Sequence, residues 1–421
     1  MTRKKVVSLP AIEQAYERIQ GLVLRTPTPK SLFHSLRHEK NIYLKLENFN
    51  ISGSFKIRGA ANALLLKPRE ELSSGVVAAS AGNHAQGVAN VCRHLKVKAT
   101  IFMPVGTPLI KVESTKQLGA EVVLVGDTYD DAYDQALAFQ NNHKAVMIHP
   151  FADEDVICGQ GSIAIELIEQ FPDLGMVIVP IGGGGLISGI ACALKEVSPK
   201  TKIIGVQAAA FPAMQASLAA GKPLQSLPAS TIADGIAVKS VHPLNYSLIE
   251  RYVDDIVLVE EEEIAAAIME LMERNRTLAE GAGAASVAAF NAIASKNWYG
   301  VKNQPIVSII CGGNIDINLL RKITMRGMIY SGRMMRLRAK IKDRPGSLAD
   351  LLEVLGDVGA NILEIHHDRS FSQAHYQEVE VDIEIETASL EHQHQIKSGL
   401  DDANINYELL EAVVQRVWSA T

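Results

Sequence analysis

The stretch MVIVPIGGGGLISGIACAL, residues 176–194, decides how this chain folds. It contains no charged residue, so its hydrophobicity alone would also suit a membrane-spanning helix. Its order argues otherwise, because MVIVPI is typical of a strand buried on both faces, the next four residues are glycines, and LISGIACAL has a helical pattern of small residues. Four consecutive glycines and a proline at mid-span do not suit a membrane helix. The stretch therefore predicts a strand, a glycine loop and a helix.

The composition indicates a folded protein of more than one domain. The chain has 421 residues, 47% of them hydrophobic and 21% charged, and this length exceeds that of one ordinary core. The formal net charge of −6 gives no electrostatic reason to expect nucleic acid or an anionic membrane as a partner. The 4 cysteines form no C-x-x-C pair, and no apolar run of signal-peptide length follows the basic N-terminus. We therefore expect reduced thiols in a cytoplasmic enzyme.

Strand-like runs alternate with helical patterns from residue 1 to about residue 330. This alternation predicts an α/β fold with a mainly parallel sheet, in which ligands bind beyond the carboxyl ends of the strands. Ser80, Gly182, Gln207 and Cys311 follow or end predicted strands and are therefore candidates for a site. The predicted strands are residues 42–47, 75–80, 99–104, 121–126, 145–150, 176–181, 202–207 and 305–310.

The pattern changes after about Arg333. Three strands and two helices are followed by a last apolar segment, which together give the order β-α-β-β-α-β of a split βαβ unit. The predicted strands are residues 335–343, 362–370, 376–387 and 407–417, and the helices lie within 344–361 and 390–405. The sequence thus predicts a domain boundary at 330/331.

A lysine with unusual surroundings stands in ISGSFKIRGA, residues 51–60. A lysine in a turn is usually a solvated surface charge, and Lys56 alone does not exclude that interpretation. Small residues and Phe55 surround it, however, and a partly desolvated ammonium loses its proton more easily and can form a Schiff base.

The segment SAGNHAQGVA, residues 80–89, follows a predicted strand directly. Backbone N–H groups and the amide of Asn83 at such a turn suit a carboxylate or another anion. The alternative is a capped helix in which Asn83 and His84 only satisfy the turn. The residues alone leave both interpretations open.

The glycine loop favours a single phosphate group over a dinucleotide. The pattern G-x-G-x-x-G fails at Ser188, and the next predicted strand ends in Gln207 where sites for NAD carry an acidic residue. A glycine turn that only allows close helix packing is the alternative, although four consecutive glycines cost backbone entropy.

The fourth segment is IICGGNID, residues 309–316. No histidine near Cys311 in the sequence could activate its thiol, so we expect a buried structural cysteine and not a nucleophile. A weak hydrogen bond from this thiol to a ligand ring stays open. A candidate Schiff-base lysine, a phosphate loop and a carboxylate-binding turn together fit pyridoxal phosphate, which has an aldehyde and one phosphate and acts on amino acids.

These four segments resemble the signatures of fold-type-II pyridoxal-phosphate enzymes, in the branch of the serine/threonine dehydratases and serine racemases. The tail, with DRPGSL at its first strand-to-helix turn, resembles an ACT-like regulatory domain. The resemblance implies a two-lobed, three-layer αβα catalytic domain at 1–330, with a small lobe inserted at about 51–150. It also implies an α+β, ferredoxin-like domain at 331–421.

The resemblance also assigns roles to residues. Lys56 would hold the cofactor and then act as the base on the substrate Cα hydrogen, and Asn83 would hydrogen-bond the ring hydroxyl of the cofactor. Cys311 would face the pyridine nitrogen and leave the ring largely unprotonated. The other expected cofactor contacts are Phe55, Gly182, Gly183, Gly184, Gly185, Leu186 and Gly312, with the phosphate on 182–186. The expected substrate contacts are Ser54, Ser80, Ala81, Gly82 and His84, and the expected effector residues are Arg344, Pro345 and Gly346.

The reaction implied by the resemblance is β-elimination of L-threonine to 2-oxobutanoate and ammonia, the first step of isoleucine biosynthesis. Isoleucine, with valine as a possible antagonist, would be the effector of a homotetramer or a dimer. The alternatives are an L-serine dehydratase, a serine racemase and a non-catalytic amino-acid sensor. Ala81 speaks against the racemase, because racemases of this branch carry a serine there as the second base, and Lys56 speaks against the sensor.

Two further points stay open at the sequence level. Relatives with a divalent-cation site carry a carboxylate just before TIADG, where this chain has Ser230, so we assign no metal ligand. The preference for threonine over serine depends on an apolar niche for one methyl group, to which Phe55 and Ala237 are candidate contributors.

Overall fold

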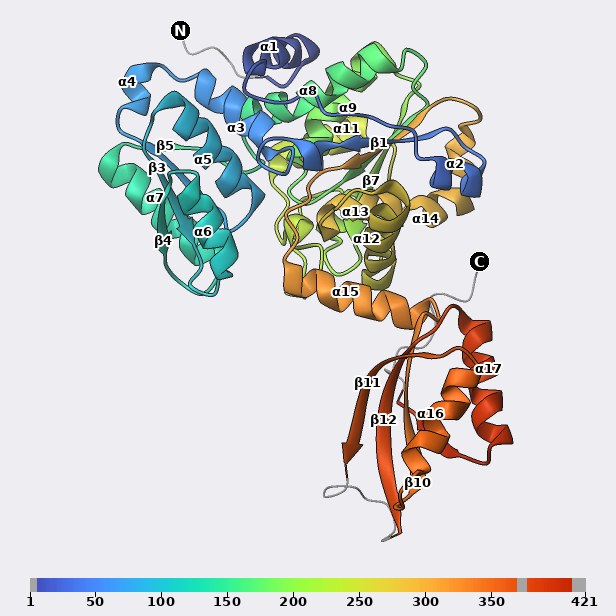
Figure 1. Ribbon diagram of the computed structural model, residues 1–421. Helices are drawn as coiled ribbons and strands as arrows, with labels where there is room; N and C mark the ends of the chain where they lie inside the picture. Colours follow the sequence, from blue (N-terminus) through green and yellow to red (C-terminus); the bar gives the residue numbers. More distant parts are fainter. Residues whose placement is uncertain (1–5, 369–376, 411–421) are drawn as a thin grey trace. The chain divides into compact units, whose positions relative to one another are not determined.

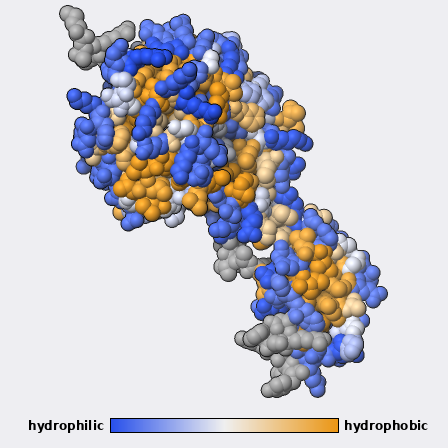
Figure 2. Space-filling model, turned by 60° about the vertical axis from the view of Figure 1, so that its left-hand side comes forward, coloured by the Kyte–Doolittle hydropathy of each residue, from blue (hydrophilic) through white to orange (hydrophobic). Residues whose placement is uncertain are grey.

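The computed structural model describes residues 6–368 and 377–410 and divides into two compact units, residues 1–316 and 317–421 (Figure 1). On the face drawn in Figure 2, hydrophobic areas lie among hydrophilic ones on both units. No helix among the described residues is long and apolar enough to cross a membrane.

The first unit alternates strands and helices. Its strands are β1 (Ile42–Leu46), β2 (Val76–Ala79), β3 (Ala99–Met103), β4 (Glu121–Leu124), β5 (Val146–Met147), β6 (Met176–Pro180), β7 (Lys202–Ala208), β8 (Asp255–Val259) and β9 (Ile306–Ile310). Its α-helices are α1 (Leu9–Ile19), α2 (Leu32–His38), α3 (Lys56–Leu65), α4 (Arg69–Leu72), α5 (Asn83–Leu95), α6 (Leu109–Gln117), α7 (Tyr129–His143), α8 (Glu154–Gln170), α9 (Gly185–Val197), α10 (Ala213–Ala220), α11 (Pro243–Tyr252), α12 (Glu261–Asn275), α13 (Gly281–Ala288) and α14 (Phe290–Ser295). Its 3-10 helices are η1 (Glu47–Phe49), η2 (Asp234–Ile236) and η3 (Asn297–Gly300).

The strands of this unit form two parallel sheets. The five-stranded sheet of the large lobe has the order β1-β9-β6-β7-β8, and the four-stranded sheet of the small lobe has the order β4-β3-β2-β5. Every residue of β6 and β9 is buried, as expected for central strands covered on both faces. The strand, loop and helix predicted from residues 176–194 are confirmed as β6, the glycine loop and α9.

The small lobe has three layers. Val76 and Ala78 of β2 pack in one core cluster with residues of α3 and α5, whereas Val77 and Ala79 pack in another with residues of α7. Because successive side chains of a strand point to opposite faces, helices cover both faces of this sheet (Figure 1). The resemblance implied αβα layering for the catalytic domain as a whole, and the small lobe has this layering.

All eight strands predicted for residues 1–330 are present, and the parallel arrangement is confirmed. The sequence analysis missed β8, whose short apolar run stands between acidic residues and which lies at the edge of its sheet. A short edge strand shows neither a long apolar run nor a regular alternation, so its pattern is weak.

The second unit begins with a helix and continues with the predicted β-α-β-β-α-β order. Its elements are α15 (Ile317–Tyr330), β10 (Met334–Lys342), α16 (Ser347–Asp357), β11 (Asn361–Asp368), β12 (Glu378–Glu386), α17 (Leu390–Asp402) and β13 (Asn406–Leu409). The antiparallel sheet has the order β11-β12-β10-β13, and Leu337 and Ile383 of its inner face pack with Leu351 of α16 and Leu400 of α17. Residues 411–417 of the last predicted strand lie outside the described residues.

The division after Asp316 differs from the expected boundary at 330/331 because α15 belongs to the second unit. The change of pattern in the sequence marks the start of the sheet at β10. This change does not mark the start of α15, because the sequence of α15 has the same kind of helical pattern as the helices of the first unit.

Candidate active site

A cavity of about 550 Å³ lies in the first unit at the carboxyl ends of β2, β6 and β9. Residues of both lobes line it, as expected for a ligand site in a parallel α/β protein. Those used below are Phe55, Lys56, Ser80, Ala81, Gly82, Asn83, His84, Lys111, Pro150, Phe151, Gly182, Gly183, Gly184, Gly185, Leu186, Asp234, Ile236, Ala237, Val238, Glu280, Cys311 and Asn314.

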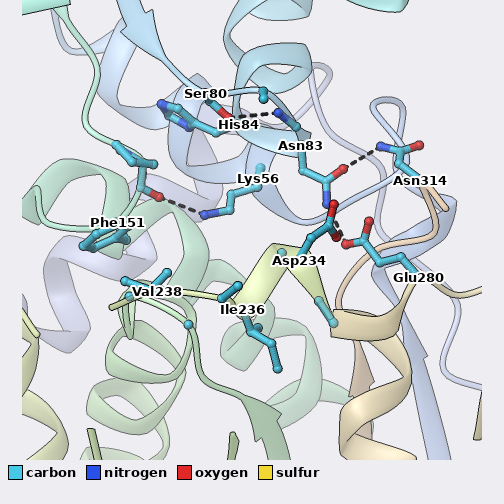
Figure 3. A pocket seen from close by; sticks show the side chains of 18 of the residues that line it. Lys56, Ser80, Asn83, His84, Phe151, Asp234, Ile236, Val238, Glu280 and Asn314 are labelled. Carbon is cyan, nitrogen blue, oxygen red and sulfur yellow. Dashed lines mark hydrogen bonds between the residues drawn. The ribbon is translucent and has the colours of Figure 1, made fainter. Parts of the chain in front are cut away.

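Lys56 is the first residue of α3, and its side chain lies in the middle of Figure 3. The Nζ atom donates a 3.0 Å hydrogen bond to the carbonyl oxygen of Pro150 and lies 5.1 Å from the centre of the Phe55 ring. Burial lowers the pKa of the Lys56 ammonium to about 8, although Cys311 and Glu280 act in the opposite direction. The amine therefore loses its proton far more readily than an exposed lysine and can attack an aldehyde.

The loop before Lys56 is tied to the end of β9. The Phe55 amide donates to the Cys311 carbonyl at 3.0 Å, and Ser54 pairs with Gly312 in an isolated bridge. Ser54 is fully buried. Neither Ser54 nor Gly312 is among the residues that line the cavity, so the structure does not bring these two expected contacts to it.

The turn from Ser80 to His84 joins β2 to α5. Ser80 Oγ accepts a 3.2 Å hydrogen bond from the Gly82 amide, and α5 begins at Asn83. His84 is buried, and its Nε2 lies 2.8 Å from the Ile148 carbonyl. Burial lowers the pKa of His84 to about 3, so its ring is neutral and donates to that carbonyl. The contact fixes the turn beside Lys56, and Ala81 and Gly82 line the cavity.

Asn83 belongs to a hydrogen-bonded chain that the sequence analysis missed (Figure 3). Its Nδ2 donates to Glu280 Oε1 at 2.6 Å, and its Oδ1 accepts from Asn314 Nδ2 at 2.7 Å. Burial raises the pKa of Glu280 to about 7. A glutamate directly before the run GAGAA was the available signal, because a charged residue before a helix of small, buried residues needs a partner.

The four glycines after β6 form the wall of the cavity at the N-terminus of α9. A Cβ at Gly182 would lie 2.9 Å from Ile236 Cα, and one at Gly183 would lie 2.3 Å from the Phe151 ring. Gly184 has a φ of +88°, which glycine adopts without strain. Close packing therefore requires these glycines, which agrees with the alternative that a glycine turn allows close packing. The loop also lines the cavity with Leu186, and N–H groups at a helix N-terminus suit a phosphate group.

Cys311 directly follows β9 and is 3% exposed. Burial raises the pKa of its thiol well above the ordinary value, so the group keeps its proton. A buried, protonated thiol is a poor nucleophile, which agrees with the expected structural role.

The expected effector residues do not line this cavity, and the sequence analysis assigned no metal ligand. Arg344, Pro345 and Gly346 are exposed residues of the second unit just before α16, and Arg344 lies 3.9 Å from Asp350. In residues 6–368 and 377–410, no group of three or more His, Cys, Asp or Glu side chains could hold a metal ion.

The arrangement fits pyridoxal phosphate. A desolvated amine for the aldehyde, a glycine loop for the phosphate and an amide turn for a carboxylate line the same cavity. The residues that could hold the cofactor are therefore Lys56, Asn83, Cys311 and the loop from Gly182 to Leu186.

Comparison with known proteins agrees with this geometry. Residues 19–312 match the family model described as "Pyridoxal-phosphate dependent enzyme". The chain is 43% identical to the L-threonine ammonia-lyase of Thermotoga maritima over 94% of this chain and 97% of that relative. The processed form of threonine deaminase isoform 2 from Solanum lycopersicum matches with a TM-score of 0.71 and 38% identity, over 76% of this chain and 87% of that one.

A maize serine racemase structure matches with a TM-score of 0.72 and 33% identity, over 77% of this chain and 98% of that one. The fold of the first unit, the residues gathered in its cavity and these similarities agree with one another. The chain belongs to the family of pyridoxal-phosphate-dependent enzymes.

Proposed function

We propose that this chain is a threonine ammonia-lyase, which converts L-threonine to 2-oxobutanoate and ammonia by β-elimination. The observation that carries the proposal is the position of Lys56, whose desolvated amine shares one cavity with the glycine loop and the Ser80–His84 turn. The 43% identity with an L-threonine ammonia-lyase over 94% of the chain supports it.

The roles implied by the family resemblance fit the places of these residues in the cavity. Gly182 to Leu186 would hold the phosphate of the cofactor, and Asn83 would donate to its ring hydroxyl. When bound, the cofactor supplies an electron sink for the charge that develops at the substrate Cα. The turn at Ser80–Gly82 binds the substrate carboxylate through backbone N–H groups.

Lys56 takes the Cα proton. Its amine is neutral in a useful fraction near pH 8, because burial lowers its pKa to about that value. Cys311 keeps its proton because burial raises the pKa of its thiol, and it would present this weak acid to the pyridine nitrogen of the cofactor. A weaker electron sink suits elimination more than transamination.

The side chain of threonine needs an apolar niche for its methyl group. Phe55 and Ala237 line the cavity, as expected, and Figure 3 places Ile236 and Val238 on the side of Lys56 opposite Ser80. One methyl group in such a niche is worth about 1–3 kcal/mol. We therefore propose threonine as the better substrate and serine as a poorer one.

We further propose that the second unit is an ACT-like regulatory domain, that isoleucine inhibits the enzyme through it, and that the enzyme serves isoleucine biosynthesis. The support is the β-α-β-β-α-β order with the sheet order β11-β12-β10-β13. The exposed turn at Arg344–Gly346, with Gly346 at a φ of +96°, leads into α16. A cytoplasmic homotetramer or dimer completes the proposal.

The experiment is to follow 2-oxo acid formation from L-threonine and from L-serine, with and without isoleucine, using purified protein loaded with pyridoxal phosphate. Oxobutanoate that falls on addition of isoleucine supports both the reaction and the regulatory unit. Oxobutanoate that ignores isoleucine supports the reaction and contradicts the effector. The absence of any 2-oxo acid in a cofactor-loaded protein would contradict the proposed reaction. Lys56→Ala is the control, and it should lose at least about a thousandfold in kcat.

A further inference from the structure

Glu280 is a buried acid at the edge of the cavity whose position is unusually well defined. It is 5% exposed, and its Oε1 accepts a 2.6 Å hydrogen bond from Asn83 Nδ2. A Cβ at Gly312 would lie 2.3 Å from the same oxygen, so glycine at that position leaves room for the carboxylate. Burying a carboxylate without a partner lowers the stability of the folded state. A role for Glu280 in the site would explain why the fold keeps an acid at this position.

The first consequence concerns the amide of Asn83. Its nitrogen donates to Glu280 and its oxygen accepts from Asn314, whose Nδ2 also lies 3.0 Å from Gln86 Oε1. Because an amide with both ends engaged cannot flip without losing two hydrogen bonds, its orientation is fixed. One N–H of Asn83 remains for a ligand in the cavity.

The second consequence concerns charge. Two groups, Cys311 and Glu280, oppose the effect of burial and favour the protonated form of Lys56. Cys311 carries no charge at neutral pH, because burial raises the pKa of its thiol well above the ordinary range. Glu280 and Lys56 line the same cavity. Of these two groups, Glu280 alone can therefore bring negative charge to the Lys56 nitrogen, and it does so above about pH 7, where its carboxyl group is ionised.

The charged groups that face Glu280 come from both lobes. Asp234 favours its protonated form, whereas Lys111 and Lys56 favour its ionised form. Lys111 and Asp234 form an ion pair of 2.6 Å, so their effects on Glu280 partly cancel.

We propose that Glu280 is a positioning residue that fixes the Asn83 amide and supplies the negative charge that keeps a proton on the Lys56 nitrogen while that nitrogen holds the cofactor. The inference rests on the proposed role of Lys56. It does not depend on which amino acid the enzyme converts.

The test is a pH titration of the visible absorbance of the bound cofactor in full-length holoenzyme. Glu280→Gln keeps an acceptor for Asn83 and removes the charge. We expect the pH midpoint for loss of the protonated form to fall by about one unit, a tenfold change in that equilibrium. Glu280→Asp, which restores the charge, should recover part of the shift.

Glu270→Gln is the matched control. Burial raises the pKa of Glu270 as well, but this residue lies on α12, pairs with Arg37 and does not line the cavity. Its midpoint should equal that of the wild type. A Glu280→Gln holoenzyme with a wild-type midpoint overturns the inference.

Gly312→Ala provides a second variant, for the case that Glu280→Gln does not fold or retain the cofactor. The added methyl group displaces the carboxylate while its charge remains, so the midpoint should fall by less than one unit, and an unchanged midpoint overturns the inference. The proposed reaction is judged separately, because a wild type with visible cofactor absorbance but no 2-oxo acid contradicts that reaction and leaves this titration valid.

Discussion

At the scale of single residues, chemistry depends on what a side chain lacks as much as on what it carries. Ala81 lines the cavity between Ser80 and Gly82 and has no exchangeable proton. Lys56 is thus left as the proposed base on one face of the substrate, and a second base would be needed for racemisation.

Ala81→Ser tests this directly. A hydroxyl at this position can deliver a proton to the opposite face, so racemisation of L-serine should rise by roughly tenfold or more. Chiral chromatography of serine measures D-serine, and 2-oxo acid formation from L-threonine is the control. Elimination that persists with no additional D-serine would show that Ala81 does not separate the two reactions.

His34 is a residue whose burial governs stability and not chemistry. It is 1% exposed and lies edge-on to the rings of Phe33 and Phe290. Neither ring nitrogen has a hydrogen-bond partner among the described residues, and a Glu270 oxygen lies 3.9 Å from Nδ1, beyond hydrogen-bond distance. Burial lowers its pKa from 6.5 to about 4, with smaller effects of His38 and Arg37. The folded state therefore resists protonation that the unfolded chain accepts.

The sign follows from linkage. Because the folded pKa lies below the unfolded one, stability is present above about pH 6.5 and is lost as the pH falls toward 4, by up to about 3 kcal/mol. His34→Phe removes the group that becomes protonated, so its thermal midpoint should fall less than that of the wild type when the pH is lowered from 7 to 5. A constant difference between the two proteins at both pH values would contradict the prediction.

At the scale of elements, a buried ionic cluster joins α3 to η1, β1 and α8. Arg58 of α3 contacts Glu47 at 2.8 Å and Glu166 of α8 at 2.6 Å, and Lys45 of β1 also pairs with Glu166. All four side chains are essentially inaccessible to solvent. Removing one partner leaves a buried charge uncompensated.

Glu166→Gln should therefore lower the free energy of unfolding by about 3–5 kcal/mol. Glu169→Gln is the matched control on the same helix, because Glu169 also pairs with an arginine, Arg25, at 2.7 Å but is 45% exposed. It should cost less than about 1 kcal/mol. Urea denaturation of both variants measures the difference, and equal losses would mean that burial does not decide the strength of these pairs.

The elements also show how far the sequence allowed prediction. Central strands such as β6 and β9 were predictable because burial on both faces makes every residue apolar. The edge strand β8 lacks that pattern and was missed. Lys56 and Asn83 were found because each stands in a short motif at the start of a helix. Glu280 and Asn314 were not, because only the folded chain brings them to Asn83.

At the scale of the whole molecule, the division after Asp316 separates the cavity from the exposed turn at Arg344–Gly346. The residues that line the cavity all belong to the first unit, and the split βαβ fold belongs to the second. If the second unit regulates, a change at its turn should alter the response to an effector and leave the chemistry intact.

Arg344→Ala in the full-length chain tests this separation. Its guanidinium lies 3.9 Å from Asp350 in the first turn of α16, and backbone N–H groups at a helix N-terminus can bind the carboxylate of an amino acid. We expect the isoleucine concentration for half inhibition to rise by about tenfold, with kcat for threonine unchanged. Lys342→Ala removes an exposed positive charge two residues away and is the matched control. If both variants respond to isoleucine like the wild type, the turn is not the effector site. If kcat falls in Arg344→Ala without isoleucine, the turn affects catalysis even without an effector, and regulation and chemistry are not separated between the two units.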